Sequence, residues 1–498
     1  MFEKSALETL IAFDKKIKQL DEINALLGWD REVYMPEKGS EQRAEQSALI
    51  ASYHHSLLIS DTMKKLLESV CNENLSDTEK GYVAFMKKKY ETAVCLPQKW
   101  VEEESKTLSM AQDVWVEAKK KNDFKLFQPW LEKIVKLQQE RGEFIAPCLP
   151  NAKNTYDVLL DQYEPSVSSE LLISLFSEVE PALRKIVQIR KEKQLEMPPW
   201  VTALYPIEGQ RAFAGHLLKY MEFDTLSGRL DETMHPFTTT LGGQDVRITT
   251  HYYENLLQSG IFSIIHEAGH GLYEQNIDSW IRLTSAGSGV SMGIHESQSR
   301  MWENIFGRGK SFWTYLFPLL KQEFPSQLHS VNLDSWVDSI NYITPSLIRT
   351  EADEVTYSLH IMLRFKIEQA LITNQITVSQ VPEMWNSLME EMLGIIPSTD
   401  SEGCLQDVHW AAGLFGYFPS YALGNFYGAQ FISAMKKDGV NIDKCLENAE
   451  LTPVHSWLKK NIWQYGSTVL PTDLLLKSTG STLSSKPFIN YLEEKYCK

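Results

Sequence analysis

The sequence predicts a mainly α-helical protein that forms a single unit, and three observations support this prediction. First, apolar residues recur at steps of three and four between charged positions along most of the chain, as on helices that bury one face. Second, stretches with the alternation and β-branched residues of strands are few. Third, the 498 residues contain no Pro-, Gly- or Ser-rich linker long enough to separate domains, and no internal repeat. We therefore expect residues 1–498 to form a single large helical unit, for which two lobes around a cleft are one possible arrangement.

The first helix is predicted between Ser5 and Leu27, where apolar residues stand at helical spacing among charged ones. The same pattern predicts further helices at residues 41–70, 78–92, 98–121, 125–144, 169–194, 208–221, 310–323, 346–373 and 379–393. The strongest strand signal is Asp245–Tyr253, which is rich in β-branched residues and follows the turn-like pair Gly242-Gly243. We therefore expect a small ribbon or sheet directly before the central motif of the chain.

Composition and charge exclude one class of function. The chain carries 49 basic and 65 acidic side chains, which give a formal net charge of −16 and a pI near 5.3. A protein that binds nucleic acid needs a basic face to neutralise phosphates, so we expect no nucleic-acid partner. Hydrophobic residues at 43% and charged residues at 23% describe an ordinary globular protein with ample material for a core.

No membrane or export segment is predicted. Residues 410–435 carry no charge and could cross a bilayer on length alone, but glycines, a proline and side-chain amides interrupt them. Glu3, Lys4 and Glu8 stand where a secretory signal would need an apolar run. The six cysteines form no CxxC pair and suit free thiols in a reducing compartment. We expect a cytoplasmic protein with reduced cysteines and no membrane partner.

The motif that carries chemistry is H-E-x-x-H, at His266, Glu267 and His270. On a helix, residues four apart lie on the same face, so both imidazoles can reach one metal ion. Glu267 is rotated toward the position at which a metal-bound water would lie. A bare pentapeptide also arises by chance, and the alternative is a buried helix with two histidines in the core.

The rest of the sequence narrows the class of metal site. A metzincin would need Gly at position 273 and His at position 276, but the chain has Tyr273 and Asn276. The remaining common arrangement takes its third ligand from a carboxylate on a later helix. Glu296 is our candidate, because it follows a Gly-rich turn at residues 286–293 that can fold a second helix back against the first. Glu303 is the alternative on the same helix.

Two imidazoles, one carboxylate and one open position form the ligand set of catalytic zinc. Such an ion polarises a carbonyl and lowers the pKa of its water, so peptide hydrolysis is the expected reaction. Glu267 would accept the proton from that water and pass it to the leaving amine.

Beyond these residues, the chain resembles the M32 metallocarboxypeptidases, the carboxypeptidase Taq type. Six motifs occur in the order of that family: His235-Pro-Phe237, Asp245-Val-Arg-Ile-Thr249, the H-E-x-x-H at 266–270, His295-Glu-Ser-Gln298, Ile348-Arg-Thr-Glu-Ala-Asp353 and Gly403-Cys-Leu-Gln-Asp-Val-His-Trp410. Weaker matches extend the resemblance over essentially the whole chain. The segments Met35-Pro-Glu-Lys-Gly39 and Gly480-Ser481 depart from the family pattern, away from the proposed chemistry.

The resemblance implies a two-lobed, mostly helical zinc-metallopeptidase fold with a deep groove, a metal at its floor, and a small sheet next to the H-E-x-x-H helix. It also implies a homodimer that removes single residues from the free C-termini of peptides. Zinc, or else cobalt, would be held by His266, His270 and Glu296, with Glu267 as the general base.

A carboxypeptidase must hold the free carboxylate of its substrate, and a guanidinium offers a matching planar fork. By resemblance we assign this role to Arg349. On a helix, Arg349 and Asp353 would lie one turn apart, so an ion pair on a solvated face is the alternative. Arg300 and Arg247 are further candidates, and Arg247 could instead form a structural ion pair with Asp245 on the same side of the strand.

Other polar residues of the matching motifs could contact the substrate. His235, His409 and Tyr421 could donate hydrogen bonds to the oxyanion or to the substrate backbone, although a lone His or Tyr is more often a core residue. Histidines that ligate a metal usually bond a carboxylate through their other nitrogen. The candidates for that carboxylate are Asp353, Glu354 and Asp407.

Two other functions remain open at this point. A dipeptidyl carboxypeptidase or oligopeptidase would share the metal site but hold the chain end differently. A catalytically silent helical binding protein would have lost Glu267 or a ligand, and all of these residues are intact. An aminopeptidase fits less well, because no G-x-M-E-N-like block precedes the motif.

Overall fold

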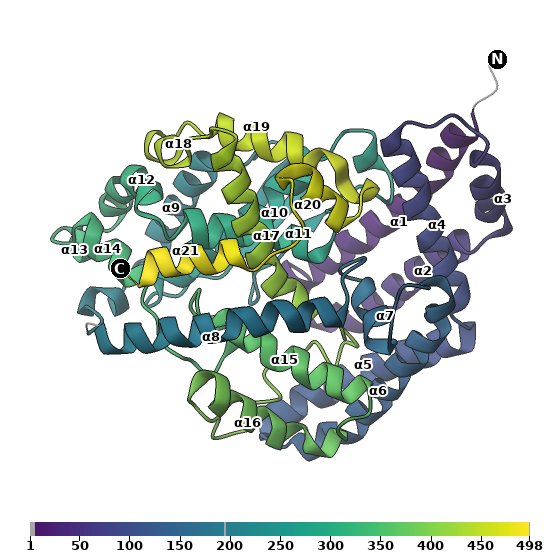
Figure 1. Cartoon of the computed structure of the whole chain (residues 1–498), viewed down its shortest axis with the longest axis horizontal. Coiled ribbons are helices and arrows are strands. Elements are labelled where there is room, and N and C mark those ends of the chain that lie inside the picture. Colours follow the sequence, from purple (N-terminus) through teal and green to yellow (C-terminus); the bar gives the residue numbers. More distant parts are fainter. Residues whose placement is uncertain (1–4, 194–195, 498) are drawn as a thin grey trace.

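The computed structural model describes residues 5–193 and 196–497, and its predominantly helical chain is shown in Figure 1. The first half contains α1 (Ala6–Val33), α2 (Ser40–Leu58), α3 (Asp61–Val70), α4 (Asp77–Cys95), α5 (Gln98–Lys121), α6 (Phe124–Ile145), α7 (Thr155–Asp161), α8 (Ser169–Lys193) and α9 (Ile207–Tyr220). The second half contains α10 (Leu257–Asn276), α11 (Met292–Arg300), α12 (Lys310–Glu323), α13 (Pro325–Leu328), α14 (Leu333–Ile340), α15 (Tyr357–Ile372), α16 (Val381–Leu393), α17 (Phe418–Lys437), α18 (Ile442–Asn448), α19 (Thr452–Asn461), α20 (Pro471–Thr479) and α21 (Lys486–Tyr496). The predicted fold class, mainly helical with a small sheet beside the H-E-x-x-H helix, is confirmed.

Most predicted helices are found within a few residues of their expected ends. The first continues to Val33, beyond the predicted end at Leu27. Residue 194, at the end of the helix predicted over 169–194, lies outside the described residues, as do Glu3 and Lys4.

The helix predicted over residues 41–70 is two helices. The side chain of Ser60 accepts a hydrogen bond from the backbone N–H of Met63 at 3.2 Å and so caps the start of α3. A serine at this position satisfies an N–H group that a helix start leaves unpaired, and it therefore favours a new helix over a continuous one.

The prediction of a helix over residues 346–373 is wrong for about its first third. Only α15 is an α-helix there, and it is preceded by a single 3₁₀ turn at Arg349–Glu351. The Asp353 carboxylate accepts hydrogen bonds from the backbone N–H groups of Val355 and Thr356, both at 2.9 Å. A short acidic side chain that bonds nearby backbone in this way competes with the helical pattern and holds the segment as a turn.

The sheet has three short strands: β1 (Gly228–Glu232), β2 (Thr238–Thr240) and β3 (Val246–Thr250). Its order is β1-β3-β2, with β3 parallel to β1 and antiparallel to β2, so that Val246 faces both Gly228 and Thr240. The predicted strand over 245–253 is confirmed in its first part. Both β2 and β3 pack on α10, which places the sheet directly beside the H-E-x-x-H motif.

The helices α10, α11 and α17 lie together at the centre of the molecule (Figure 1). Two glycines permit their close approach. A Cβ on Gly269 of α10 would lie 2.8 Å from Cα of Ser299, and a Cβ on Gly424 of α17 would lie 2.6 Å from Cγ of Glu296. Since real side chains do not approach so closely, glycine is required where α11 is packed between the other two helices.

The charge-free segment over 410–435 contains most of α17, which is buried along nearly its whole length. Its apolar character is therefore explained by its place in the core. Among the described helices, none is both long enough and apolar enough to cross a membrane.

Candidate metal centre

Three side chains converge at the face of α10 that meets α11. Nε2 of His270 lies 3.3 Å, and Nε2 of His266 3.6 Å, from Oε2 of Glu296. One ligand atom from each residue lies within 4.8 Å of the others. The helical spacing of the two histidines and the return of the chain through the 286–293 turn produce this convergence, as the sequence predicted.

The site is buried on the carboxylate side and open on the imidazole side. The Glu296 side chain is 7% exposed, whereas the His266 and His270 side chains are 19% and 16% exposed. A small ion and a water molecule can therefore reach the histidines from solvent.

His266 is oriented by Glu303, the alternative third ligand. Nδ1 of His266 lies 2.8 Å from Oε2 of Glu303, which is on the opposite side of the ring from Glu296. Glu303 belongs to a π-helical turn at Met301–Phe306 that continues α11. Although burial raises the pKa of Glu303, Arg300 and His266 lower it to about 2. Glu303 is thus a charged carboxylate that fixes the imidazole, which leaves Glu296 as the carboxylate that faces both Nε2 atoms.

His270 is oriented by a second histidine, which the sequence analysis did not single out. Nδ1 of His270 lies 2.5 Å from Nδ1 of His295, and Nε2 of His295 lies 2.8 Å from Oε1 of Glu274. Because Glu274 accepts, Nε2 of His295 carries the hydrogen, and its Nδ1 is then the acceptor for Nδ1–H of His270. These two hydrogen bonds leave the lone pair on Nε2 of His270 free. The position of Glu274, one turn after His270 on the same helix face, was the signal available in the sequence.

Glu267 lies on the same helix but faces the sheet. It is 6% exposed, and its Oε2 accepts a hydrogen bond of 2.6 Å from the Thr238 hydroxyl of β2. Burial raises the pKa of Glu267 from its ordinary value. A carboxylate with increased proton affinity beside the two histidines is suited to accept a proton.

The side chain of Glu296 is shared between the histidines and Arg300. Nε of Arg300 donates to Oε1 of Glu296 at 2.7 Å, and the guanidinium lies 3.8 Å from the ring centre of Tyr357. Arg300 also donates to Glu303 at 3.2 Å. Nε and Nη1 of Arg300 are thus engaged by the two carboxylates.

Arg349 also contacts Tyr357. Its Nη1 donates to the Tyr357 hydroxyl at 3.0 Å, and its Nε and Nη2 donate to Oδ1 of Asp407 at 3.0 and 2.8 Å. The alternative ion pair with Asp353 is wrong, because the segment is a turn and Asp353 bonds its own backbone. The guanidinium is buried and lies 5.0 Å from the ring centre of Tyr421.

His409 and Tyr421 are brought together beside Arg349. Nε2 of His409 lies 3.1 Å from the Tyr421 hydroxyl. Burial and the nearby Arg349 lower the pKa of His409 to about 3, so this imidazole is neutral near pH 7. The His409 imidazole and the Tyr421 hydroxyl are thus two hydrogen-bonding groups next to the Arg349 guanidinium.

Arg247 and His235 are placed differently. Arg247 pairs with Asp245 at 2.8 Å and stacks over Trp29 at 4.1 Å, which is the structural ion pair given as the alternative. His235 is exposed in the segment between β1 and β2.

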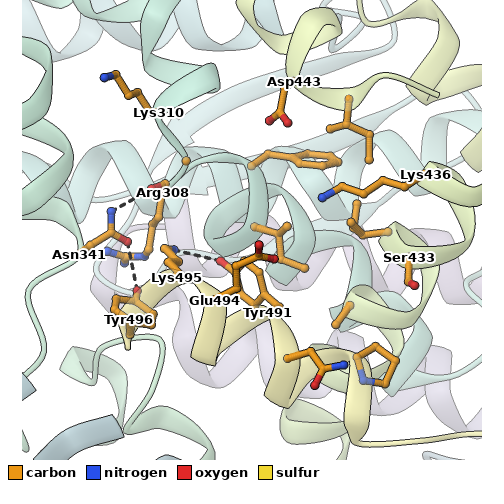
Figure 2. A pocket seen from close by; sticks show the side chains of 18 of the residues that line it. Arg308, Lys310, Asn341, Ser433, Lys436, Asp443, Tyr491, Glu494, Lys495 and Tyr496 are labelled. Atoms are coloured by element: carbon orange, nitrogen blue, oxygen red, sulfur yellow. Dashed lines mark hydrogen bonds between the residues drawn. The ribbon is translucent and has the colours of Figure 1, made fainter. Parts of the chain in front are cut away.

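The three carboxylates expected behind the histidines bind elsewhere. Asp407 is held between Arg349 and Arg364, and Asp353 accepts hydrogen bonds from the backbone in the turn before α15. Glu354 accepts hydrogen bonds of 2.7 Å each from Tyr491, Tyr496 and Lys495. Figure 2 shows these three residues of α21, which line a cavity of about 590 Å³. Arg308 lines the same cavity, and its Nη2 lies 3.8 Å from Oε1 of Glu303. The carboxylates that orient the histidines are Glu303 and, through His295, Glu274.

The donor set fits a divalent metal ion. Hydrogen bonds to both Nδ1 atoms leave the two Nε2 lone pairs free, and these meet one carboxylate oxygen within the reach of a single ion. His266, His270 and Glu296 would hold the ion.

Comparisons with known proteins agree with this arrangement. A family model described as carboxypeptidase Taq (M32) metallopeptidase matches residues 9–496. Carboxypeptidase 1 of Bacillus subtilis is 40% identical over 99% of this chain and 98% of its own length, and thermostable carboxypeptidase 1 of Thermus thermophilus is 38% identical over 100% and 99%. The crystal structure of an M32 carboxypeptidase from Deinococcus radiodurans matches with a TM-score of 0.95 at 32% identity, and covers 99% of this chain and 98% of that one.

These matches extend over the whole fold as well as the site. A metallocarboxypeptidase requires a divalent ion and acts on peptides, and the three converging ligands of α10 and α11 supply a site for such an ion. This chain belongs to the M32 family of metallocarboxypeptidases.

Proposed function

We propose that this protein removes single residues from the free C-terminus of peptides, with zinc held by His266, His270 and Glu296 and with Glu267 as the general base. One observation carries the proposal: two free imidazole lone pairs and the carboxylate oxygen of Glu296 converge, and a second, buried carboxylate, Glu267, follows the first histidine. Membership of the family supports carboxypeptidase activity and a divalent ion, whereas zinc and the individual roles are our assignments.

A divalent ion at this site supplies a Lewis acid that polarises the scissile carbonyl and makes a bound water more acidic. The protein contributes the orientation of its ligands. Glu303 and His295 hold the two imidazoles by Nδ1, and Arg300 holds one oxygen of Glu296, so the ligand atoms need no reorganisation when substrate arrives.

Glu267 accepts the proton from the attacking water and returns it to the leaving amine. Thr238 donates to Oε2, which fixes the carboxylate plane and leaves Oε1 for the water. The increased pKa that follows from burial strengthens Glu267 as a base and lets it hold the proton until the amine leaves.

Arg349 holds the free carboxylate of the substrate. Its bond from Nη1 goes to the hydroxyl of Tyr357, which is a weaker acceptor than a carboxylate, so a substrate carboxylate can replace it. Asp407 keeps the other edge of the guanidinium in place. His409 and Tyr421 then lie beside the terminal residue, where they can donate to the oxyanion or to the peptide backbone.

The proposal is tested with one peptide in two forms. The zinc-loaded protein is incubated with an N-terminally blocked peptide that ends in a free carboxylate and with the same peptide as its C-terminal amide, and products are followed by mass. We expect stepwise loss of single residues from the free acid alone, and no loss with Glu267→Gln. Two-residue or internal cuts would instead indicate a dipeptidyl carboxypeptidase or oligopeptidase, and no cleavage with metal bound would indicate a silent binding protein.

A further inference from the structure

Two cysteines that are far apart in the sequence meet in the structure. Cys95 is the last residue of α4, and Cys148 ends the 3₁₀ turn Ala146–Cys148 that follows α6. Their Sγ atoms lie 2.6 Å apart, although 53 positions separate them in the chain. No spacing in the sequence indicated this pair, because it depends on how α4 packs against the end of α6.

The pair is open to small molecules. Both residues are half-buried, and they form part of the wall of a surface hollow of about 420 Å³ whose other lining residues are Glu91, Val94 and Pro147. Burial in this hollow is partial, so a reagent of the size of a peptide thiol can reach either sulfur. By contrast, Cys404 and Cys445 are buried, and Cys71 is exposed at the end of α3.

The distance makes the two thiols a disulfide-forming pair. The S–S bond is about 2.05 Å long, so the sulfurs need to approach by roughly half an ångström to bond. Side-chain rotation at the two residues supplies a movement of this size without displacing either helix, because each cysteine ends its element and is followed by irregular chain.

We propose that Cys95 and Cys148 are a site of reversible oxidation, at which a small disulfide such as oxidised glutathione converts the two thiols to an intramolecular disulfide. In the first step the thiolate of one cysteine attacks a sulfur of the reagent and releases one glutathione thiolate, which leaves a mixed disulfide. In the second step the other cysteine displaces the second glutathione. The two cysteine protons are taken up by the two released thiolates, and the pair of electrons lost by the protein reduces the reagent.

The protein environment sets the rate of this reaction. Burial and the neighbouring Cys95 raise the pKa of the Cys148 thiol to about 12. Because the thiolate is the attacking species, Cys148 is a poor nucleophile near neutral pH, and attack by Cys148 accelerates as the pH rises.

The disulfide would tie α4 to the end of α6 and close a loop that contains α5 and α6. Closing a loop of this length restricts the unfolded chain and stabilises the folded one. The helix α4 also anchors the N-terminal helices, since Tyr82 donates to the buried Asp14 of α1 at 3.0 Å. Oxidation should thus increase the resistance of this part of the fold to unfolding.

The test uses the full-length, metal-loaded protein with oxidised glutathione at pH 8, and with dithiothreitol in parallel. Free thiols are counted, peptides are mapped by mass without reduction, and the thermal midpoint is measured. The variants are Cys95→Ser and Cys148→Ser, with Cys71→Ser as the matched control for an exposed cysteine.

We expect the wild type and Cys71→Ser to lose two thiols, to yield a peptide that joins positions 95 and 148, and to unfold a few degrees higher when oxidised. All three changes should be absent from Cys95→Ser and Cys148→Ser. In the wild type, glutathione that remains attached to Cys95 or Cys148, a bridge between two chains, or an unchanged thiol count would each overturn the proposal. None of these measurements depends on peptidase activity.

Discussion

The Nδ1 atoms of His270 and His295 face each other at 2.5 Å, and Glu274 lies 2.8 Å from the far side of the His295 ring. This bond fixes which nitrogen of His270 carries a hydrogen, and so makes its Nε2 a ligand atom. His266 reaches the same state by direct contact with Glu303. A carboxylate orients His266 and a second histidine orients His270, and in both residues Nε2 is left as the ligand atom.

Loss of either support should weaken metal binding. We expect Glu274→Gln and Glu303→Gln each to lower the affinity for zinc by about 10–100-fold, because the imidazoles lose the carboxylates that hold their protons and orientation. Competition with a coloured chelator measures the affinity. Glu222→Gln is the matched control, since Glu222 also pairs with a histidine, His455 at 3.2 Å, but outside the metal site. An equal loss in the control would contradict a specific role.

Glu267→Gln separates catalysis from metal binding. The substitution keeps the shape of the side chain but removes the base, so we expect kcat to fall by about 10²–10⁴-fold while one zinc per chain remains bound. Steady-state kinetics and metal analysis of the same preparation give both quantities. Appreciable activity in metal-loaded Glu267→Gln would require another proton acceptor.

Arg349 should control recognition of the substrate carboxylate. Replacing it by lysine keeps the charge opposite Asp407 but removes the planar fork, so we expect KM for a free-acid peptide to rise by roughly 10–100-fold, the value of one or two charge-assisted hydrogen bonds. The thermal midpoint, measured alongside, reports whether the buried pair with Asp407 survives. A fall in kcat with KM unchanged would argue against this role.

Stability should fall as the pH rises through the range in which a buried carboxyl ionises. Burial raises the pKa of Glu164, and hydrogen bonds from Tyr427, Gly293 and Ser291 lower it. Burial has the larger effect, so the pKa rises from 4.5 to about 7. The folded state therefore binds more protons than the unfolded state between these values, and the free energy of unfolding decreases with pH there, by at most about 1.4 kcal/mol per pH unit for one group. About one pH unit above 7, where Glu164 is ionised in both states, this contribution levels off.

Glu164→Gln tests the assignment, because the amide is neutral at every pH and the hydroxyls around it can either donate or accept. Its thermal midpoint between pH 5 and pH 8 should depend less on pH than that of the wild type. The same slope in both proteins would mean that another group, such as Glu368, whose pKa burial also raises to about 7, is responsible.

The sequence predicted those parts of the site that local geometry determines. Helical spacing places His266 and His270 on one face, and the Gly-rich turn returns Glu296 to them. Partners set by packing were not predictable: Asp407, which holds Arg349, is 58 positions further along the chain, and the turn before α15 removes the expected pairing with Asp353. The homodimer, the cytoplasmic location and the choice of zinc stay predictions.

The approach of α17 to Glu296 gives a last test, which acts on the metal site without touching a ligand. A Cβ at Gly424 would lie 2.6 Å from Cγ and 2.8 Å from Cβ of Glu296. Because both helices are fixed in the core, Gly424→Ala should displace Glu296, reduce zinc affinity and lower the thermal midpoint. Gly215→Ala is the control, since a Cβ there meets nothing within 4 Å and alanine favours the helix α9. The control should bind zinc normally and be slightly more stable. If Gly424→Ala bound zinc as tightly as the wild type, the position of α17 would not be what holds Glu296 against the two histidines.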